Sequence, residues 1–231
     1  MPDVGYKYDG TFCGFLTVIY DVIKNGDRPL KIDSIYKDES DLFLEYIFIK
    51  SDEEKSNQVL NHFLKNNKGR VIKDIFYAFL SNENEIEIKI FNYISQVIKN
   101  SKNIRLDYSN NEVLSIRKIV DRVKLERHRF LGILRFNEIN FQNNETILYA
   151  SIKPDNNIVY LVATHFKERL KNQKFLIHDM SRGVGVYYDK KILSFIDITL
   201  NEEVNSFYTE EEKTYQKLWQ TYFKNIAIKE R

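Results

Sequence analysis

The pattern of apolar and polar residues predicts a strongly periodic helix in the middle of the chain, within residues 115–136. Apolar residues recur there at steps of three and four, as on one face of a helix with 3.6 residues per turn. They are Ile116, Ile119, Val120, Val123, Phe130, Leu131 and Leu134. Gly132 weakens the helix, and the pattern predicts that a strand begins at Ile133. Because Arg127 falls inside the apolar stripe, we expect its guanidinium to be paired or to reach outward.

Three more helices are predicted before this central helix. Apolar stripes with helical spacing occupy residues 59–64, 72–80 and 86–98. The acidic residues 51–54 favour the start of a helix, since negative charge is stabilised near a helix N-terminus. With the central helix, these three segments predict a compact helical bundle.

The remaining segments alternate between strand and helix patterns. The first part of the chain predicts a strand at 5–9, a helix at 12–24, and strands at 30–36 and 42–50. The part after the central helix predicts strands at 147–152, 158–162, 174–178, 184–188 and 192–198, a short helix at 164–171, and an amphipathic helix at 210–226.

These elements predict an α+β fold, with a mixed or antiparallel sheet and a helical bundle inserted before the basic helix. We expect one domain over residues 1–231. Its helical part spans approximately residues 51–131, and its mixed part combines residues 1–50 with residues 132–231.

The charge of the chain is nearly balanced, at +2, so the field of the whole protein cannot attract nucleic acid and a local patch would be needed. The central helix offers such a patch. Its polar faces carry Arg117, Lys118, Arg122, Lys124, His128 and Arg129, against Asp121 and Glu126. One interpretation is a phosphate-binding surface. The other is a solvated face whose basic residues pair with acidic segments elsewhere, and charge alone favours the second.

The sequence has a single cysteine, Cys13, which excludes a disulfide within the chain, a cysteine-ligated cluster and a four-thiolate zinc site. We expect Cys13 to be a small buried apolar residue, and we expect no metal and no cofactor. No N-terminal signal sequence and no apolar run of membrane-spanning length is visible, so we expect a cytoplasmic protein with no membrane partner.

Histidines and carboxylates in the second half of the chain could supply acid–base chemistry. The candidates are Glu126, His128, His165, His178 and Asp179. Their spacing matches no zinc or hydrolase motif, and a surface or hydrogen-bonded histidine is the simpler interpretation of each. An enzyme that acts on a nucleotide or damaged base stays open as an alternative, and it requires these side chains to converge in one pocket.

Five blocks in order along the chain resemble a bacterial family called probable DNA metabolism proteins. They are Tyr8-Asp9-Gly10-Thr11-Phe12-Cys13-Gly14-Phe15-Leu16; Glu126-x-His128-Arg129 with Gly132-x-x-Arg135-Phe136; His165-Phe166-x-x-Arg169; Ile177-His178-Asp179-x-x-Arg182 with Tyr188-Asp189; and Leu218-Trp219-x-x-Tyr222-Phe223-x-x-Ile226-x-Ile228-x-x-Arg231. That family is a domain of unknown function. Some of its members are fused to a uracil-DNA glycosylase-like domain.

The resemblance implies an accessory protein of DNA repair or modification, because family members tend to be encoded beside a radical S-adenosylmethionine (radical SAM) protein thought to act on DNA. We expect the chain to bind DNA, or to hold that enzyme on DNA. The expected phosphate contacts are Arg122, Lys124, Arg129, Arg135, Arg169 and Arg182. An iron–sulfur cluster would belong to the partner, since this chain has one cysteine.

Two further expectations concern the end of the chain. Pure protein–protein scaffolding through the terminal helix and Trp219 is a third possible function. Family members usually continue past the last block with a basic, aromatic segment, whereas this chain stops at Arg231. We therefore expect that segment to be either removed by truncation or dispensable.

Overall fold

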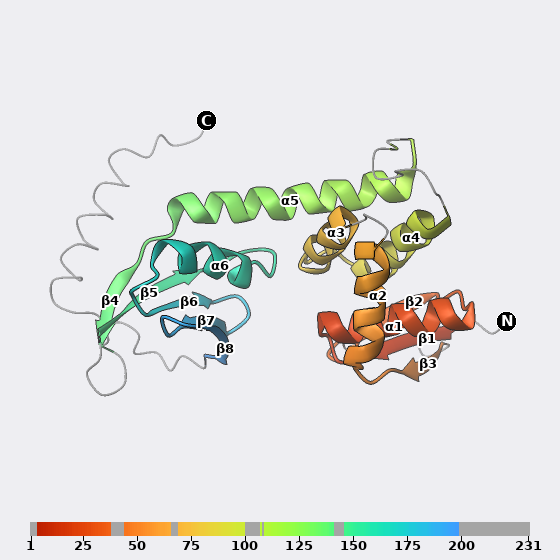
Figure 1. Cartoon of the computed structure of the whole chain (residues 1–231), viewed down its shortest axis with the longest axis horizontal. Helices are drawn as coiled ribbons and strands as arrows, with labels where there is room; N and C mark the ends of the chain where they lie inside the picture. Colours follow the sequence, from red (N-terminus) through yellow and green to blue (C-terminus); the bar gives the residue numbers. More distant parts are fainter. Residues whose placement is uncertain are drawn as a thin grey trace. The chain divides into compact units, whose positions relative to one another are not determined.

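The computed structural model describes residues 4–37, 44–65, 69–99, 107, 109–140 and 146–198 (Figure 1). The chain divides into two compact units, Met1–Leu125 and Glu126–Arg231, and each unit has its own sheet. The mixture of helices and strands confirms the α+β class. The predicted arrangement as one domain with a helical insertion stays a prediction.

The sheet of the N-terminal unit has three parallel strands in the order β2-β1-β3. They are β1 (Val4–Tyr8), β2 (Lys31–Ser34) and β3 (Glu45–Phe48). Helix α1 (Phe12–Asn25) connects β1 to β2, and such a crossover is what places two consecutive strands parallel.

The ends of α1 follow from local sequence. The Thr11 Oγ1 accepts a hydrogen bond from the Gly14 N–H at 2.9 Å, which caps the N-terminus. Gly26 ends the helix in the left-handed region, at φ 74°, and its N–H is donated back to the Ile23 carbonyl. The predicted helix at 12–24 is therefore confirmed.

A close approach explains Gly14 in the first block of the sequence. A Cβ at Gly14 would lie 2.2 Å from the Asp9 Oδ1 and 2.7 Å from the Ser51 Oγ. The Asp9 carboxylate accepts hydrogen bonds from the Thr11 N–H and Oγ1 and from the Ser51 hydroxyl. Burial alone would raise the pKa of Asp9, but these hydrogen bonds outweigh it and lower the pKa.

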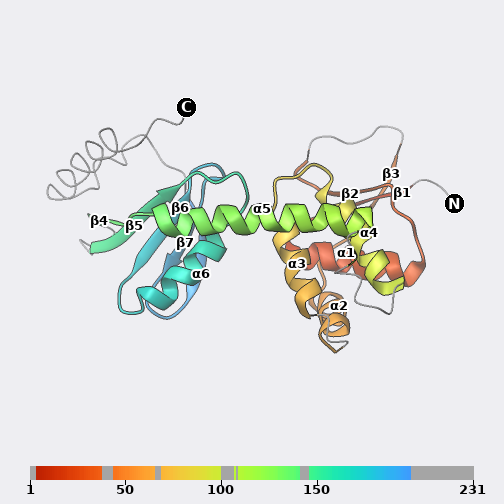
Figure 2. The same ribbon diagram turned by 90° about the horizontal axis from the view of Figure 1, so that it is seen from above.

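Three helices follow the first sheet, as the apolar stripes predict: α2 (Glu53–Lys65), α3 (Gly69–Phe79) and α4 (Ile86–Lys99). Helix α2 packs against α1, and Phe12 of α1 contacts the rings of Phe76 and Phe79 of α3. Helix α5 (Asn111–Ile133) then runs without interruption, as both ribbon views show (Figure 2). The Asn110 side chain accepts the N–H groups of Glu112 and Val113 at its start.

The apolar stripe of α5 is buried at Ile116, Ile119, Val120 and Val123, as predicted. The strand predicted to begin at Ile133 is wrong, because Ile133 is the last residue of α5 and β4 (Asn137–Asn140) starts only after a short connection. One glycine, Gly132, costs a helix only about 1 kcal/mol, too little to end it against a favourable stripe.

The C-terminal unit has a five-stranded mixed sheet in the order β4-β5-β6-β7-β8. Its other strands are β5 (Thr146–Ile152), β6 (Phe175–Asp179), β7 (Val184–Tyr188) and β8 (Leu193–Asp197). Strands β5 and β6 pair in parallel, because α6 (Val159–Arg169) connects them, and the other described pairs of this sheet are antiparallel.

The strand predicted at 158–162 is wrong, since Ile158 is the N-cap of α6 and the next four residues form its first turn. Their β-branched composition favoured a strand. The buried residues, however, are Ile158, Val159, Val162, Ala163 and Phe166, which is the spacing of one helix face.

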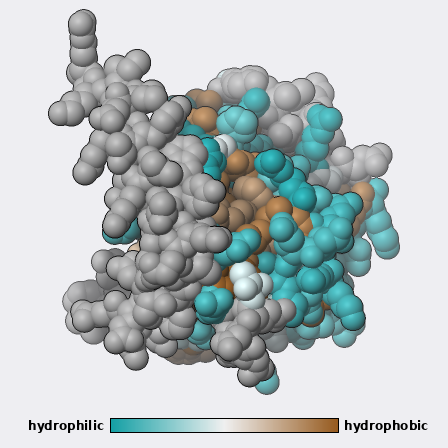
Figure 3. Space-filling model, turned by 90° about the vertical axis from the view of Figure 1, so that its left-hand side faces the viewer, coloured by the Kyte–Doolittle hydropathy of each residue, from teal (hydrophilic) through white to brown (hydrophobic). Residues whose placement is uncertain are grey.

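The two faces of this sheet bury different residues. On one face Phe175 and Tyr188 pack with Phe136, whose ring also contacts Phe166 of α6. The alternate residues form a second apolar cluster on the other face, made of Ile139, Ile147, Tyr149 and Leu176, with Tyr187, Ile196 and Ile198 against it. A space-filling view shows hydrophobic residues gathered in a strip with hydrophilic residues beside it (Figure 3).

The predicted terminal helix at 210–226 and Trp219 lie outside the described residues. Within the described ranges, no helix has the length and apolar character that crossing a membrane requires.

Candidate functional site

The Glu126 carboxylate holds the loop between β5 and α6. Its Oε1 accepts the Asp155 N–H at 2.6 Å, and its Oε2 accepts the Asn156 N–H at 3.1 Å and the Asn156 Nδ2 at 2.6 Å. Both oxygens of this candidate catalytic base are thus engaged with loop donors. The arrangement is that of a carboxylate that orders a turn.

Asp179 and Arg182 hold the same loop from the other side. Asp179, at the end of β6, is fully buried, and its Oδ2 accepts the Arg182 Nη1–H at 2.9 Å. Arg182 also donates to the carbonyl oxygens of Pro154 and Asp155, at 3.3 and 2.7 Å. The guanidinium is therefore neutralised by a buried carboxylate and engaged by loop carbonyls.

His178 precedes Asp179 and points to the opposite face of the sheet, because side chains alternate along a strand. It is only 2% exposed, and its Nδ1 lies 3.0 Å from the Tyr149 hydroxyl. Burial lowers the pKa of His178, and the nearby charge of Asp179 opposes that shift only in part. The geometry is that of a neutral histidine hydrogen-bonded in a core.

The basic cluster, which we define as Arg127, His165 and Arg169, lies where α5 meets α6. The Arg127 Nε donates to the Leu161 carbonyl at 3.3 Å, which joins the two helices. Burial lowers the pKa of the half-buried His165, and the positive charges of Arg127 and Arg169 lower it further. These charges therefore act together at one place on the C-terminal unit.

The five candidate catalytic residues are distributed over different places. Of these five described residues, hydrogen bonds join only Glu126 and Asp179 into one network, through the 154–156 loop. His178 lies on the far side of the sheet, His165 belongs to the basic cluster, and His128 is exposed on α5. No group of three or more possible metal ligands occurs among the residues that the structure describes.

Two of the six predicted phosphate contacts pair with carboxylates in the N-terminal unit. Arg122 bonds to Glu83, and the Lys124 ammonium lies 3.6 Å from the buried carboxylate of Asp74. With Arg182 bound to Asp179, half of the predicted set is neutralised by ion pairs.

The other three have different surroundings. Arg135 donates to the carbonyl oxygens of Gly132 and Leu134, at 3.0 and 2.9 Å. Arg129 is exposed on α5. Arg169 is exposed on α6, with its guanidinium 5.9 Å from the centroid of the Phe166 ring. For Arg129 and Arg169, the described part of the chain offers no carboxylate within ion-pair distance.

Sequence reasoning missed Arg127 as a functional candidate and missed Tyr149 and Asn156 as partners. Arg127 carried a signal, since it was the one charged residue in the apolar stripe of the central helix. Tyr149 and Asn156 carried none, because they meet His178 and Glu126 only after the chain has folded.

Comparisons with known proteins place the chain in a family. No curated protein matches it. Among solved structures, the DHH domain of a member of a family of ribosomal proteins matches with 9% identity over 80% of this chain and 73% of that chain, but the TM-score of 0.31 is too low to support an argument. A family model matches residues 84–231, which include the last four of the five blocks and not the first. Since this match covers more than half of the sequence, the chain belongs to the family described as a domain of unknown function, DUF4130.

Proposed function

We propose that the C-terminal unit binds the phosphate backbone of DNA and that the protein is an accessory factor of DNA repair or modification. The observation that carries this proposal is the basic cluster. Its two guanidinium groups disfavour a further positive charge on His165, and a potential with that sign favours an anion.

A phosphate suits this place better than a carboxylate of the protein itself. A guanidinium presents several N–H donors in a plane and binds phosphate oxygens in pairs. Arg169 is exposed on α6, and Arg129 is exposed on α5, two residues after Arg127 and therefore on a different side of that helix. Because both side chains are exposed, DNA can approach them while the two helices stay in place.

The proposal narrows the set of expected contacts. Arg122, Lys124 and Arg182 already have carboxylate partners, so each would have to exchange an ion pair for a phosphate and would gain little net attraction. Arg129 and Arg169, together with Arg127 of the basic cluster, are the residues that we assign to DNA, and Arg135 stays an expected contact.

The accessory role is supported by the family resemblance of the blocks around Glu126, His165 and His178. It implies a radical SAM partner that would supply the chemistry, with this chain holding DNA or holding the partner on DNA. The hydrogen bonds of Glu126 and Asp179 are consistent with a binding role for this chain and a catalytic role for the partner, because both carboxylates already bond to groups that order the fold.

The test is fluorescence anisotropy with labelled single-stranded and duplex DNA at several salt concentrations. The double variant Arg129→Ala, Arg169→Ala should bind more weakly, and on duplex DNA the slope of log K against log salt should fall by about 0.9 for each phosphate that is no longer neutralised. The single variant Arg129→Ala has a matched control in Arg122→Ala, which removes one positive charge from the same helix but from an existing ion pair.

Equal binding by the double variant and the wild-type chain would contradict the DNA proposal. The accessory role has a separate test, a pull-down of the radical SAM partner with and without DNA. Capture that does not depend on DNA or on Arg129 and Arg169 would favour scaffolding in place of DNA binding.

A further inference from the structure

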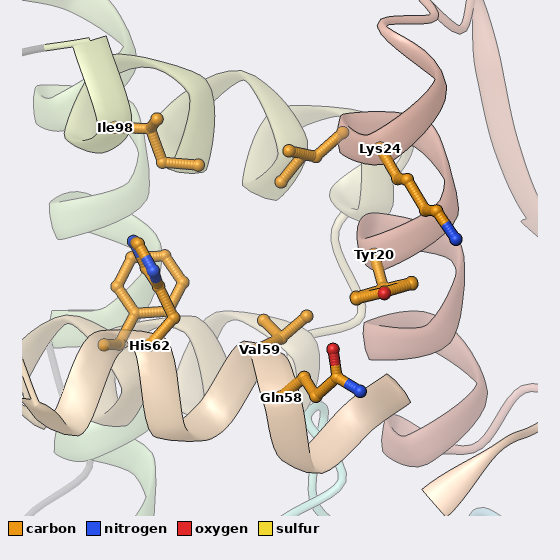
Figure 4. A pocket seen from close by; sticks show the side chains of 8 residues that line it. Tyr20, Lys24, Gln58, Val59, His62 and Ile98 are labelled. Atoms are coloured by element: carbon orange, nitrogen blue, oxygen red, sulfur yellow. The ribbon is translucent and has the colours of Figure 1, made fainter. Parts of the chain in front are cut away.

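The N-terminal unit contains a pocket with a volume of about 390 Å³ between α1, α2 and α4 (Figure 4). It lies far along the sequence from the basic cluster and plays no part in the DNA proposal. Its lining residues are Tyr20, Ile23, Lys24, Gln58, Val59, His62, Phe63 and Ile98.

The lining is mainly apolar and contains no carboxylate among these eight residues. Val59 and Phe63 are buried, whereas Ile23 and Ile98 are each 43% exposed. An apolar ligand that covered the two isoleucines would remove that surface from water, which favours binding. The volume lies within the range of small-molecule sites.

Polar groups are placed around this apolar lining. In the close view, Tyr20 and Lys24 project from α1 on one side, and His62 and Gln58 project from α2 (Figure 4). The hydroxyl of Tyr20 and the amide of Gln58 offer hydrogen bonds that can fix the orientation of a bound molecule.

Positive charge is concentrated beside Tyr20. The ammonium groups of Lys24 and Lys55 lie 5.7 and 5.9 Å from the centroid of its ring. Lys55 is held by the Asp21 carboxylate at 2.7 Å. Lys24 has no carboxylate within ion-pair distance in the described ranges, so its ammonium group remains available to an anion on this side of the pocket.

We propose that this pocket binds a small free amphiphile that has an apolar body and one anionic end, such as a medium-chain carboxylate. The body lies against Val59, Phe63 and Ile98. The anionic end lies on the Tyr20 side, where the flexible Lys24 side chain reaches it. A cationic amphiphile with the same body lacks this attraction.

The experiment uses the full chain and the fluorescent anionic probe 1-anilinonaphthalene-8-sulfonate, displaced by dodecanoate or by dodecyltrimethylammonium below their micelle concentrations. We expect one saturable site, with dodecanoate several-fold tighter than the cationic amphiphile. Lys24→Gln should remove most of that difference and keep the binding of the apolar body.

Ile98→Glu places a carboxylate at the pocket and should weaken dodecanoate binding at least several-fold. Leu64→Glu makes the same change on α2 at a residue that is 55% exposed and outside the lining, so it is the control. Circular dichroism checks that both variants fold.

Three results would overturn the proposal: no saturable displacement by free dodecanoate, equal affinity for the two amphiphiles, or equal effects of Ile98→Glu and Leu64→Glu. Binding to anionic lipid vesicles without binding of the free carboxylate would also overturn it, because the pocket would then be a membrane contact.

Discussion

The two halves of α5 have similar basic composition but different electrostatic surroundings. In the first half, up to Leu125, Arg122 and Lys124 meet the carboxylates of Glu83 and Asp74, which come from α3 and the connection after it. In the second half, Arg127 bonds to a backbone carbonyl and the exposed Arg129 has no carboxylate beside it in the part of the chain that is described. A row of basic residues in a sequence therefore does not define a positive surface, because distant acidic residues decide how much of the charge remains.

The largest expected effect on stability comes from removing the buried carboxylate of Asp179 in the C-terminal unit. Asp179→Ala should lower the free energy of unfolding by about 3 kcal/mol, because it leaves Arg182 without its buried partner and releases the 154–156 loop. Urea denaturation followed by circular dichroism measures the change.

Asp155→Ala is the control for that measurement, since the loop uses the backbone groups of Asp155 and its side chain is exposed. A loss of equal size in both variants would show that the buried ion pair of Asp179 and Arg182 makes no specific contribution to stability.

Periodicity in the sequence predicted most elements of this fold. The stripes at 12–24 and 86–98 became α1 and α4, and the strands at 174–178 and 184–188 became β6 and β7. It failed at 158–162, where a short run of apolar β-branched residues fits a buried strand and a buried helix equally well. Only packing against Phe166 and the sheet distinguishes the two.

The candidate site was less predictable than the fold. Glu126, His178 and Asp179 were found because their side chains carry chemistry, but the sequence does not show which donors they meet. Glu126 meets a loop 29 residues away in sequence, and His178 meets Tyr149 across two paired strands. Contacts of this kind depend on strand register and loop position, which no local pattern specifies.

Removing the carboxylate that pairs with Arg122 tests how much of the charge in the first half of α5 this carboxylate cancels. Glu83→Gln should release the charge of Arg122, so DNA should bind a few-fold more tightly, and the salt slope should steepen by up to about 0.9. Anisotropy with the same labelled DNA measures both quantities.

Glu54→Gln makes the same change in net charge at an exposed residue of α2, and it controls for the charge of the whole chain. If the two variants gain the same affinity, the pairing of Arg122 has no local role and the comparison between the halves fails.

The histidines of the C-terminal unit should have a smaller effect, which is a dependence of thermal stability on pH. Burial holds the pKa of His178 below its ordinary value, so the unfolded chain binds its proton more readily than the folded chain does. The stability that neutral His178 contributes is fully present above the unfolded pKa of about 6.5, and this contribution is lost as the pH falls below that value. The melting temperature should decline between about pH 7.5 and about pH 5.5.

His178→Gln should make the melting temperature depend less on pH, because the variant takes up a fraction of one proton less on unfolding. His128→Gln removes an exposed histidine of the same unit and is the control. His165 should also destabilise the fold as the pH falls, because burial and the charges of Arg127 and Arg169 lower its pKa. A profile that is unchanged in His178→Gln would assign the acid sensitivity to other groups.

The smallest effect is expected for the ion pair of Arg122 and Glu83. Lys89 and Arg122 both bond to Glu83 and lower its pKa, yet the Arg122 side chain is 64% exposed. Water screens such a pair, so a double-mutant cycle with Arg122→Ala and Glu83→Ala should give a coupling energy below about 1 kcal/mol. The pair then lowers the net charge of this part of α5 without stabilising the fold appreciably. A coupling of several kcal/mol would make these residues structural, and their substitution could no longer serve as a clean control for DNA binding.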